Sequence, residues 1–174
     1  MRKGTLTVPL VILLSTVICS LALAQGQPPP PGWGQPVPLP PANGEGQVAF
    51  SHGGTPMTLP LNAIKIDTTT PDMFMVSLTY VDATQENKLT LAFASMPKLG
   101  KNDPRLISGF VVQTKAHGLS RDAGNKTKCD FAISRLTAQD VSGTLSCTGM
   151  TDMSAENAAP DVTGVKFDGR LKAK

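Results

Sequence analysis

Apolar and polar residues alternate along most of the chain after residue 46, which is the pattern of strands buried on one face. Helical periodicity is almost absent, with one short turn expected at residues 154–159. We therefore predict an all-β domain of about seven or eight short antiparallel strands, arranged as a single β-sandwich or a partly open barrel. The clearest alternating stretches are residues 73–81, 88–95, 106–115, 127–135, 141–148 and 163–171, with weaker ones at 47–51, 57–61 and 63–67.

Two pairs of these segments predict hairpins with a defined register. Residues 73–81 and 88–95 flank a turn at 82–87, and residues 127–135 and 141–148 meet across a shorter turn. In each hairpin the register sets apolar side chains of the two segments opposite each other. The expected partners are Tyr80 and Leu89, Leu78 and Leu91, Val76 and Phe93, Phe131 and Leu145, and Ile133 and Gly143. A glycine at such a position predicts a bend in the sheet or a close approach by a neighbour.

The second hairpin also sets Cys129 opposite Cys147. Directly opposed residues of an antiparallel pair have Cα atoms about 4.5–5.5 Å apart, which lies within the range that a disulfide bond tolerates. The spacing of the two cysteines differs from the Cys-x-x-Cys motif of redox-active pairs. The sequence therefore predicts a structural disulfide bond between Cys129 and Cys147.

Residues 1–24 have the features of a secretory signal peptide. Arg2 and Lys3 supply positive charge, and the almost uncharged apolar run of residues 6–23 ends in the small residues of an Ala-Leu-Ala sequence. Two alternatives stay open. The apolar run is just long enough to be retained as a membrane anchor, and Cys19 would be a lipid-attachment site, although an isoleucine precedes it. The favoured interpretation is a cleaved leader, no stable membrane span afterwards, and a secreted or periplasmic protein.

Residues 25–45 are rich in proline, with eight prolines among 21 positions. Such a segment forms neither a helix nor a strand ladder and favours extended polyproline II structure. We interpret it as a disordered Pro/Gly-rich linker between the leader and a domain of residues 46–174. The alternative is a docking segment, because polyproline II helices bind to aromatic grooves.

Removal of the leader changes the charge balance and the number of cysteines. Without Arg2, Lys3 and Cys19 the chain keeps 14 basic residues, 13 acidic residues and two cysteines. The basic residues form no dense cluster, which argues against nucleic-acid binding because that binding depends on clustered charge. An even number of cysteines in an exported domain agrees with a disulfide bond. Asn125 begins a glycosylation sequon that only a eukaryotic secretory pathway would use.

Little in the sequence points to catalysis. His117 lies near Ser120 and Asp122, but residues this close in one loop seldom form a nucleophile triad. No Gly-x-Ser-x-Gly elbow occurs, and the carboxylates are spread singly, mostly at turns. A non-catalytic protein is therefore favoured, and a hydrolase that uses loop carboxylates is the alternative.

The methionines suggest a further alternative, a soft metal site. Thioether and imidazole groups are ligands for copper(I), whereas methionines more often fill gaps in apolar layers. No other cofactor is indicated. The candidate copper ligands are Met73, Met75, Met150, Met153, His52 and His117.

These observations predict an exported, non-catalytic binding or cell-envelope-associated protein, whose partner is a small lipophilic ligand or a protein surface. The second face of the strand at residues 73–81 carries Met73, Met75 and Val81, which are candidates to cover such a ligand. The alternatives are a loop-carboxylate hydrolase and a periplasmic protein that binds copper through methionine and histidine.

Overall fold

The computed structural model of the chain describes residues 39–69, 74–95, 98–115, 117–121, 127–153 and 160–173. These residues belong to the unit Pro36–Lys174, and nothing of the preceding unit, Met1–Gln35, is described. The predicted leader, most of the predicted linker, the predicted helical turn and the sequon at Asn125 therefore lie outside the described residues. No helix in the described part of the chain is long and apolar enough to cross a membrane.

Strands make up almost all of the described structure, as the alternating pattern predicts. Helix in the described ranges is limited to one 3-10 turn, η1 (Pro104–Leu106). The strand pairings are antiparallel and form one continuous sheet in the order β11-β8-β7-β5-β4-β3-β2-β12-β10-β9-β6, with β1 paired to β12. The strands are β1 (Gly44–Glu45), β2 (Gln47–His52), β3 (Thr55–Asp67), β4 (Phe74–Val81), β5 (Lys88–Ser95), β6 (Gly100–Asn102), β7 (Ile107–Gln113), β8 (Gly118–Ser120), β9 (Lys128–Leu136), β10 (Asp140–Thr148), β11 (Thr151–Asp152) and β12 (Val162–Leu171).

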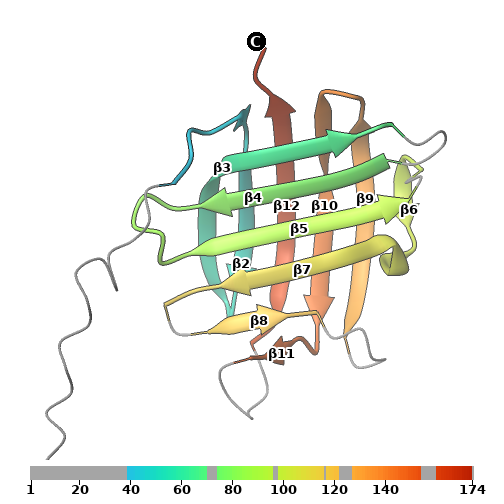
Figure 1. Cartoon of the computed structure of the whole chain (residues 1–174). Coiled ribbons are helices and arrows are strands. Elements are labelled where there is room, and N and C mark those ends of the chain that lie inside the picture. The colour runs from blue at the N-terminus through green and yellow to red at the C-terminus, as the bar shows by residue number, and fades with distance from the viewer. Residues whose placement is uncertain are drawn as a thin grey trace, which may run out of the picture. The chain divides into compact units, whose positions relative to one another are not determined.

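The sheet curls strongly because β3 takes part in both of its halves. Residues 55–60 of β3 pair with β2, whereas residues 61–67 pair with β4, and the register shifts between Leu61 and Ala63. In Figure 1, β3, β4, β5 and β7 run across the front, while β2, β12, β10 and β9 run steeply behind them. Irregularities of this kind let one strand pass from one layer to another. The two halves of the sheet therefore face each other.

The hydrophobic core lies between these two halves. The ring of Phe93 on β5 lies 5.4 Å from the ring of Phe131 on β9, measured between centroids, and Phe167 on β12 follows at 6.4 Å from Phe131. Tyr80 on β4 is fully buried and donates a hydrogen bond of 2.9 Å from its hydroxyl to the main-chain carbonyl of Asp168 on β12. Aromatic contacts at these separations stabilise a core beyond the area that they bury. Side chains from both halves therefore hold the curl in place.

The registers predicted for both hairpins are confirmed. β9 and β10 pair with Cys129 opposite Cys147, and β4 and β5 pair with Tyr80 opposite Leu89. The other predicted partners also face each other, namely Phe131 and Leu145, Ile133 and Gly143, Leu78 and Leu91, and Val76 and Phe93.

The predicted close approach at Gly143 is present as well. The register of the β9–β10 ladder shifts beside this glycine. A Cβ at Gly143 would lie 2.3 Å from the carbonyl oxygen of Ala132 and 2.6 Å from Cζ of Phe167. Only a residue without a side chain fits this position.

The described residues contain twelve strands, more than the predicted seven or eight, in one curled sheet rather than two separate ones. β1, β6, β8 and β11 have only two or three residues each, which is too short for an alternating pattern to stand out. The segments predicted at residues 57–61 and 63–67 are parts of one bent strand, β3.

The sheet begins within residues 25–45, the segment that is predicted to be a linker. Gly44 and Glu45 form β1 and pair with the end of β12. The side-chain amide of Asn43 donates to the carbonyl of Ile64 at 2.9 Å and accepts from the N–H of Ile64 at 2.8 Å. Asn43 thereby satisfies the backbone N–H and carbonyl groups of Ile64 on β3, as a neighbouring strand would.

Candidate functional site

A groove lies on the outer face of the sheet, where β12, β10, β9 and β6 are neighbours. Its volume is about 310 Å³, near the lower end of the range of small-molecule sites. The surface inside it is mostly apolar. The residues that matter most for its chemistry are Lys101, Asp130, Ala132, Thr144, Gly164 and Lys166.

Four of these residues form a row across neighbouring strands. Lys166 on β12 lies opposite Thr144 on β10. Thr144 lies opposite Ala132 on β9, which in turn lies opposite Lys101 on β6. Because neighbouring strands are about 4.8 Å apart, the backbones at the two lysines are about 14 Å apart. The row therefore has a lysine at each end and a floor of small side chains between them.

Gly164 opens one end of the groove. β12 shifts its register against β2 between Thr163 and Lys166, and Gly164, within this irregularity, has a φ of +62° that favours glycine. No heavy atom of a non-adjacent residue lies within 4 Å of the position that a Cβ would take here. A second hollow of about 330 Å³ shares Gly164 and Lys166 and extends over β2 and the start of β3. The two hollows together make a longer depression across the outer face.

The two lysines differ in their partners. The ammonium of Lys101 forms an ion pair of 3.2 Å with Asp130, and both side chains are more than 80 % exposed. Such an exposed pair contributes little to stability, typically about 0–1 kcal/mol. Lys166 is exposed and has no ion-pair partner among the described residues. Its ammonium group is therefore available to an anionic ligand.

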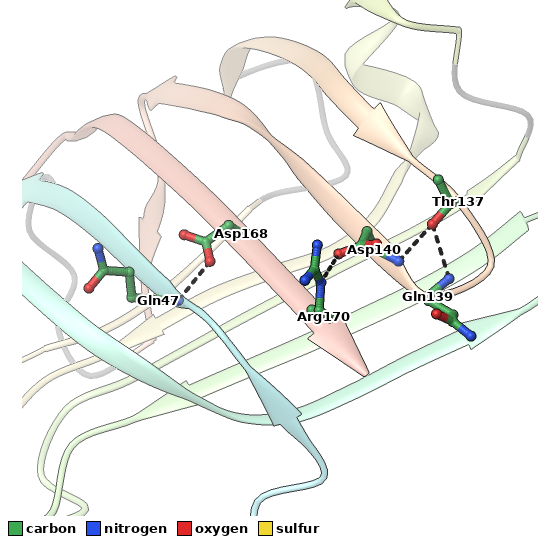
Figure 2. A network of polar contacts seen from close by, with 6 residues as sticks. All are labelled: Gln47, Thr137, Gln139, Asp140, Asp168 and Arg170. Atoms are coloured by element: carbon green, nitrogen blue, oxygen red, sulfur yellow. Dashed lines mark hydrogen bonds and ion pairs between the residues drawn. The ribbon is translucent and has the colours of Figure 1, made fainter. Parts of the chain in front are cut away.

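A larger hollow of about 860 Å³ lies by the end of β12, but its central charges are already paired. Figure 2 shows Arg170 donating from Nε to Oδ1 of Asp140 at 2.5 Å, while the N–H of Asp140 donates to the hydroxyl of Thr137 at 2.9 Å. Beside them the N–H of Gln47 donates to the carboxylate of Asp168 at 3.3 Å. The hydrogen bond with Asp140 raises the pKa of the Arg170 guanidinium. These contacts attach the β9–β10 turn and β2 to β12, so we assign them a structural role.

A second candidate site is a cluster of three residues from distant parts of the sequence, which we call the histidine cluster: His52, His117 and Asp152. His52 is the last residue of β2, His117 directly precedes β8, and Asp152 is the last residue of β11. The centroids of the two imidazole rings are 5.6 Å apart. Nδ1 of His117 lies 2.7 Å from Oδ2 of Asp152, whose side chain is only 3 % exposed.

His52 lacks a hydrogen bond where one is expected. Its Nε2 atom is buried and has no hydrogen-bond partner among the described residues. Burial lowers the pKa of His52, the neighbouring His117 lowers it further, and Asp152 acts in the opposite direction. The neutral imidazole is therefore favoured at this position, and its ring nitrogens are the groups that would receive a ligand.

The structure gathers only some of the predicted copper ligands. His52 and His117 are neighbours, and the N–H of Met153 donates to the carbonyl of Gly118 at 2.7 Å, next to His117. Met150 is buried in the core, and Met75 lies on β4, which β5 and β7 separate from β8. Met73 lies outside the described residues. Within the described ranges, no three His, Cys, Asp or Glu side chains are placed to hold a metal ion together.

The acidic partner of His117 is not its neighbour in sequence. Asp122 lies outside the described residues, and Ser120 faces Thr151 in the β8–β11 ladder. The carboxylate that contacts His117 belongs to Asp152, 35 residues away. No local motif indicates this partner, because the contact depends on a ladder of only two residue pairs.

Asp67, Asp82 and Asp103 have displaced pKa values, and all three shifts are downward. Hydrogen bonds from Thr69 lower the pKa of Asp67, and hydrogen bonds from Arg105 lower the pKa of Asp103. A general acid at neutral pH needs a shift in the opposite direction. These carboxylates are therefore suited to holding turns and not to donating protons.

The sulfur atoms of Cys129 and Cys147 are at disulfide-bonding distance, 2.06 Å apart. The two Cα atoms lie 4.2 Å apart on the directly paired strands β9 and β10. Cys147 is fully buried at the edge of the core. This pair does not resemble the Cys-x-x-Cys motif of redox-active cysteines, because each cysteine lies within a strand.

No protein-family model, no curated protein and no solved structure matches the chain.

Proposed function

We propose that the protein is a non-catalytic binding protein whose ligand is a small lipophilic anion. The observation that carries this proposal is the row of Lys166, Thr144, Ala132 and Lys101 along the groove on the outer face. In the proposed complex an acyl chain lies over the small side chains of the floor. Its carboxylate meets the ammonium group of Lys166, which has no ion-pair partner in the part of the chain that the structure describes.

The two parts of the ligand would contribute in different ways. Apolar area removed from water contributes about 25 cal/mol per Å², so the chain supplies most of the affinity. An exposed ion pair with Lys166 adds at most about 1 kcal/mol, so the lysine mainly sets the orientation of the ligand. Because the groove is open, the ligand keeps part of its surface in water. We therefore expect weak binding, with a dissociation constant above about 1 μM, which corresponds to a binding free energy weaker than about −8 kcal/mol.

The proposed setting is outside the cytosol. The leader-like residues 1–24 and the proline-rich residues 25–45 support a secreted or periplasmic protein whose domain follows an extended linker. A protein in that place meets lipophilic anions that leave or enter a membrane. This setting also favours an oxidised pair at Cys129 and Cys147.

The proposal is tested by titrating the purified, exported protein with a fluorescent polyene fatty acid and with the corresponding alcohol. We expect saturable binding of the acid and weaker binding of the alcohol, because the uncharged head group forms no ion pair with Lys166. Thr144→Trp should abolish binding by filling the floor. Thr148→Trp is the matched control, since Thr148 is exposed on the same face of the same strand but does not line the groove.

Two outcomes would contradict the proposal. The first is an absence of saturable binding to the unaltered protein. The second is equal binding by the Thr144→Trp and Thr148→Trp variants, which would place the ligand elsewhere.

A further inference from the structure

The histidine cluster shares no residue with the groove, and its hydrogen bonding indicates a separate role. Asp152 is almost completely buried and lies 2.7 Å from Nδ1 of His117. A carboxylate that accepts a hydrogen bond from one imidazole nitrogen fixes the tautomer and orients the ring. In the neutral imidazole the other nitrogen, Nε2, then carries the lone pair through which histidine binds metal ions.

The second histidine, His52, has an unpaired ring nitrogen among the described residues. Its Nε2 is buried without a hydrogen-bond partner in the described part of the chain. Buried polar atoms are nearly always paired in folded proteins, so an unpaired one points to a missing ligand. The imidazole rings of His52 and His117 are close enough to share that ligand, with centroids 5.6 Å apart and a tilt of 57°.

We propose that Nε2 of His52 and Nε2 of His117 bind one copper(I) ion, with Asp152 as the positioning residue behind His117. Two imidazoles that bind one metal ion through nitrogens about 2 Å away have ring centroids about 5–6 Å apart. The observed separation falls in this interval, so the strands already hold the two rings at the distance that a shared metal ion requires.

The donor set selects the metal. Asp152 already contacts Nδ1 of His117, and the described residues hold no group of three His, Cys, Asp or Glu side chains that could bind a metal ion together, which leaves the four-coordinate preference of zinc unmet. Met153 lies opposite Gly118 and packs against it, on the other face of the β8–β11 ladder from Asp152 and His117, so its thioether is not a ligand. Imidazole is a ligand for copper, and copper(I) accepts as few as two donors.

The ligand set differs from the one suggested by the sequence. It keeps His52 and His117 and adds Asp152 as a support. Met75 and Met150 are left out, because one lies on β4 and the other is buried in the core.

The test is an anaerobic titration of the purified protein with copper(I) in competition with a coloured copper(I) chelator. We expect the protein to withdraw one equivalent of copper(I). His52→Gln and His117→Gln should each weaken binding at least tenfold. Met75→Leu is the matched control, because Met75 is an exposed methionine on a distant strand, and it should leave the affinity unchanged.

A second measurement needs no variant. The chain has only two histidines, so their imidazole resonances are easily resolved by NMR. Adding copper(I) should shift both sets of resonances with the same stoichiometry. The proposal is overturned if neither set shifts, if zinc(II) binds more tightly than copper(I), or if Met75→Leu weakens binding as much as His52→Gln and His117→Gln do.

Discussion

The hydroxyl of Tyr80 on β4 donates a 2.9 Å hydrogen bond to the main-chain carbonyl of Asp168 on β12, 88 residues further along the chain. This bond connects the two facing halves of the curled sheet through the core. Burial raises the pKa of the phenol above its ordinary value of 10.0, and the charge of Asp168 raises it further. Tyr80 therefore links the closure of the sheet to the protonation state of one side chain.

The first prediction concerns alkaline pH. Because the pKa of Tyr80 is raised in the folded state, its contribution to stability is complete below the unfolded value of 10.0 and is lost as pH rises beyond it. Tyr80 is the only tyrosine, so the ultraviolet absorbance of tyrosinate reports this residue alone. We expect tyrosinate to appear together with unfolding seen by circular dichroism. Tyrosinate that forms near pH 10 in a still-folded protein would contradict this.

Replacement of the same residue tests the hydrogen bond at neutral pH. Tyr80→Phe keeps the buried ring and removes the donor to Asp168, which should lower the free energy of unfolding by about 1 kcal/mol. The variant should also lose the part of the alkaline destabilisation that depends on the phenol. Denaturant unfolding at neutral and at alkaline pH measures both effects, and an unchanged alkaline profile would refute the assignment.

The second prediction concerns the cysteines. Protein purified without reductant should have a mass two hydrogens below that of the reduced chain, because Cys129 and Cys147 are directly opposed. The closed loop is short and the hairpin already keeps its ends near, so Cys129→Ala with Cys147→Ala should cost about 2–3 kcal/mol or less. Mass spectrometry of the intact protein checks the bond, and chemical denaturation checks the cost. Free thiols in protein purified without reductant would rule out the bond.

The third prediction concerns Gly143. An alanine there would place its Cβ 2.3 Å from the carbonyl oxygen of Ala132, so Gly143→Ala should destabilise the fold by about 1–3 kcal/mol. Gly109→Ala is the matched control, because the new Cβ would lie at an ordinary 3.7 Å from the Cβ of Ala92. Thermal unfolding should separate the two variants clearly. Similar melting temperatures for both would show that the strand at Gly143 relaxes freely.

The fourth prediction separates charge from shape in the groove. Lys166→Gln should reduce the preference for a fatty acid over its alcohol, about fivefold or less, because the ion pair is exposed. Lys88→Gln, which removes an exposed lysine at the start of β5, should leave this preference unchanged. Fluorescence titrations with both probes provide the measurement. A loss of alcohol binding in Lys166→Gln would mean that the lysine acts through structure and not through charge.

The hairpins were predictable because their contacts are local in sequence. Tyr80 and Leu89 are joined by a short turn, and alternation on both strands leaves one register that pairs apolar side chains with apolar side chains. The same reasoning located Cys129 opposite Cys147. The very short strands β8 and β11 escaped prediction, since two or three residues carry no recognisable period.

The candidate sites could be predicted only in fragments. His52 and His117 stood out because histidine is rare in the chain, yet nothing in the sequence connects either one to Asp152. The groove was not predicted at all. Its two lysines are ordinary surface residues until β12, β10, β9 and β6 align them with Thr144 and Ala132 between them.

The amino-acid sequence by itself determined the all-β class, the two hairpin registers and the pairing of the cysteines. Those features follow from side-chain alternation and short turns, which act between residues near each other along the chain. Only the tertiary structure decided that the strands form one curled sheet, that Lys166 and Lys101 share a groove, and that Asp152 meets His117. These contacts arise from pairing between distant strands, where many arrangements satisfy the same local pattern and packing of the whole core selects one.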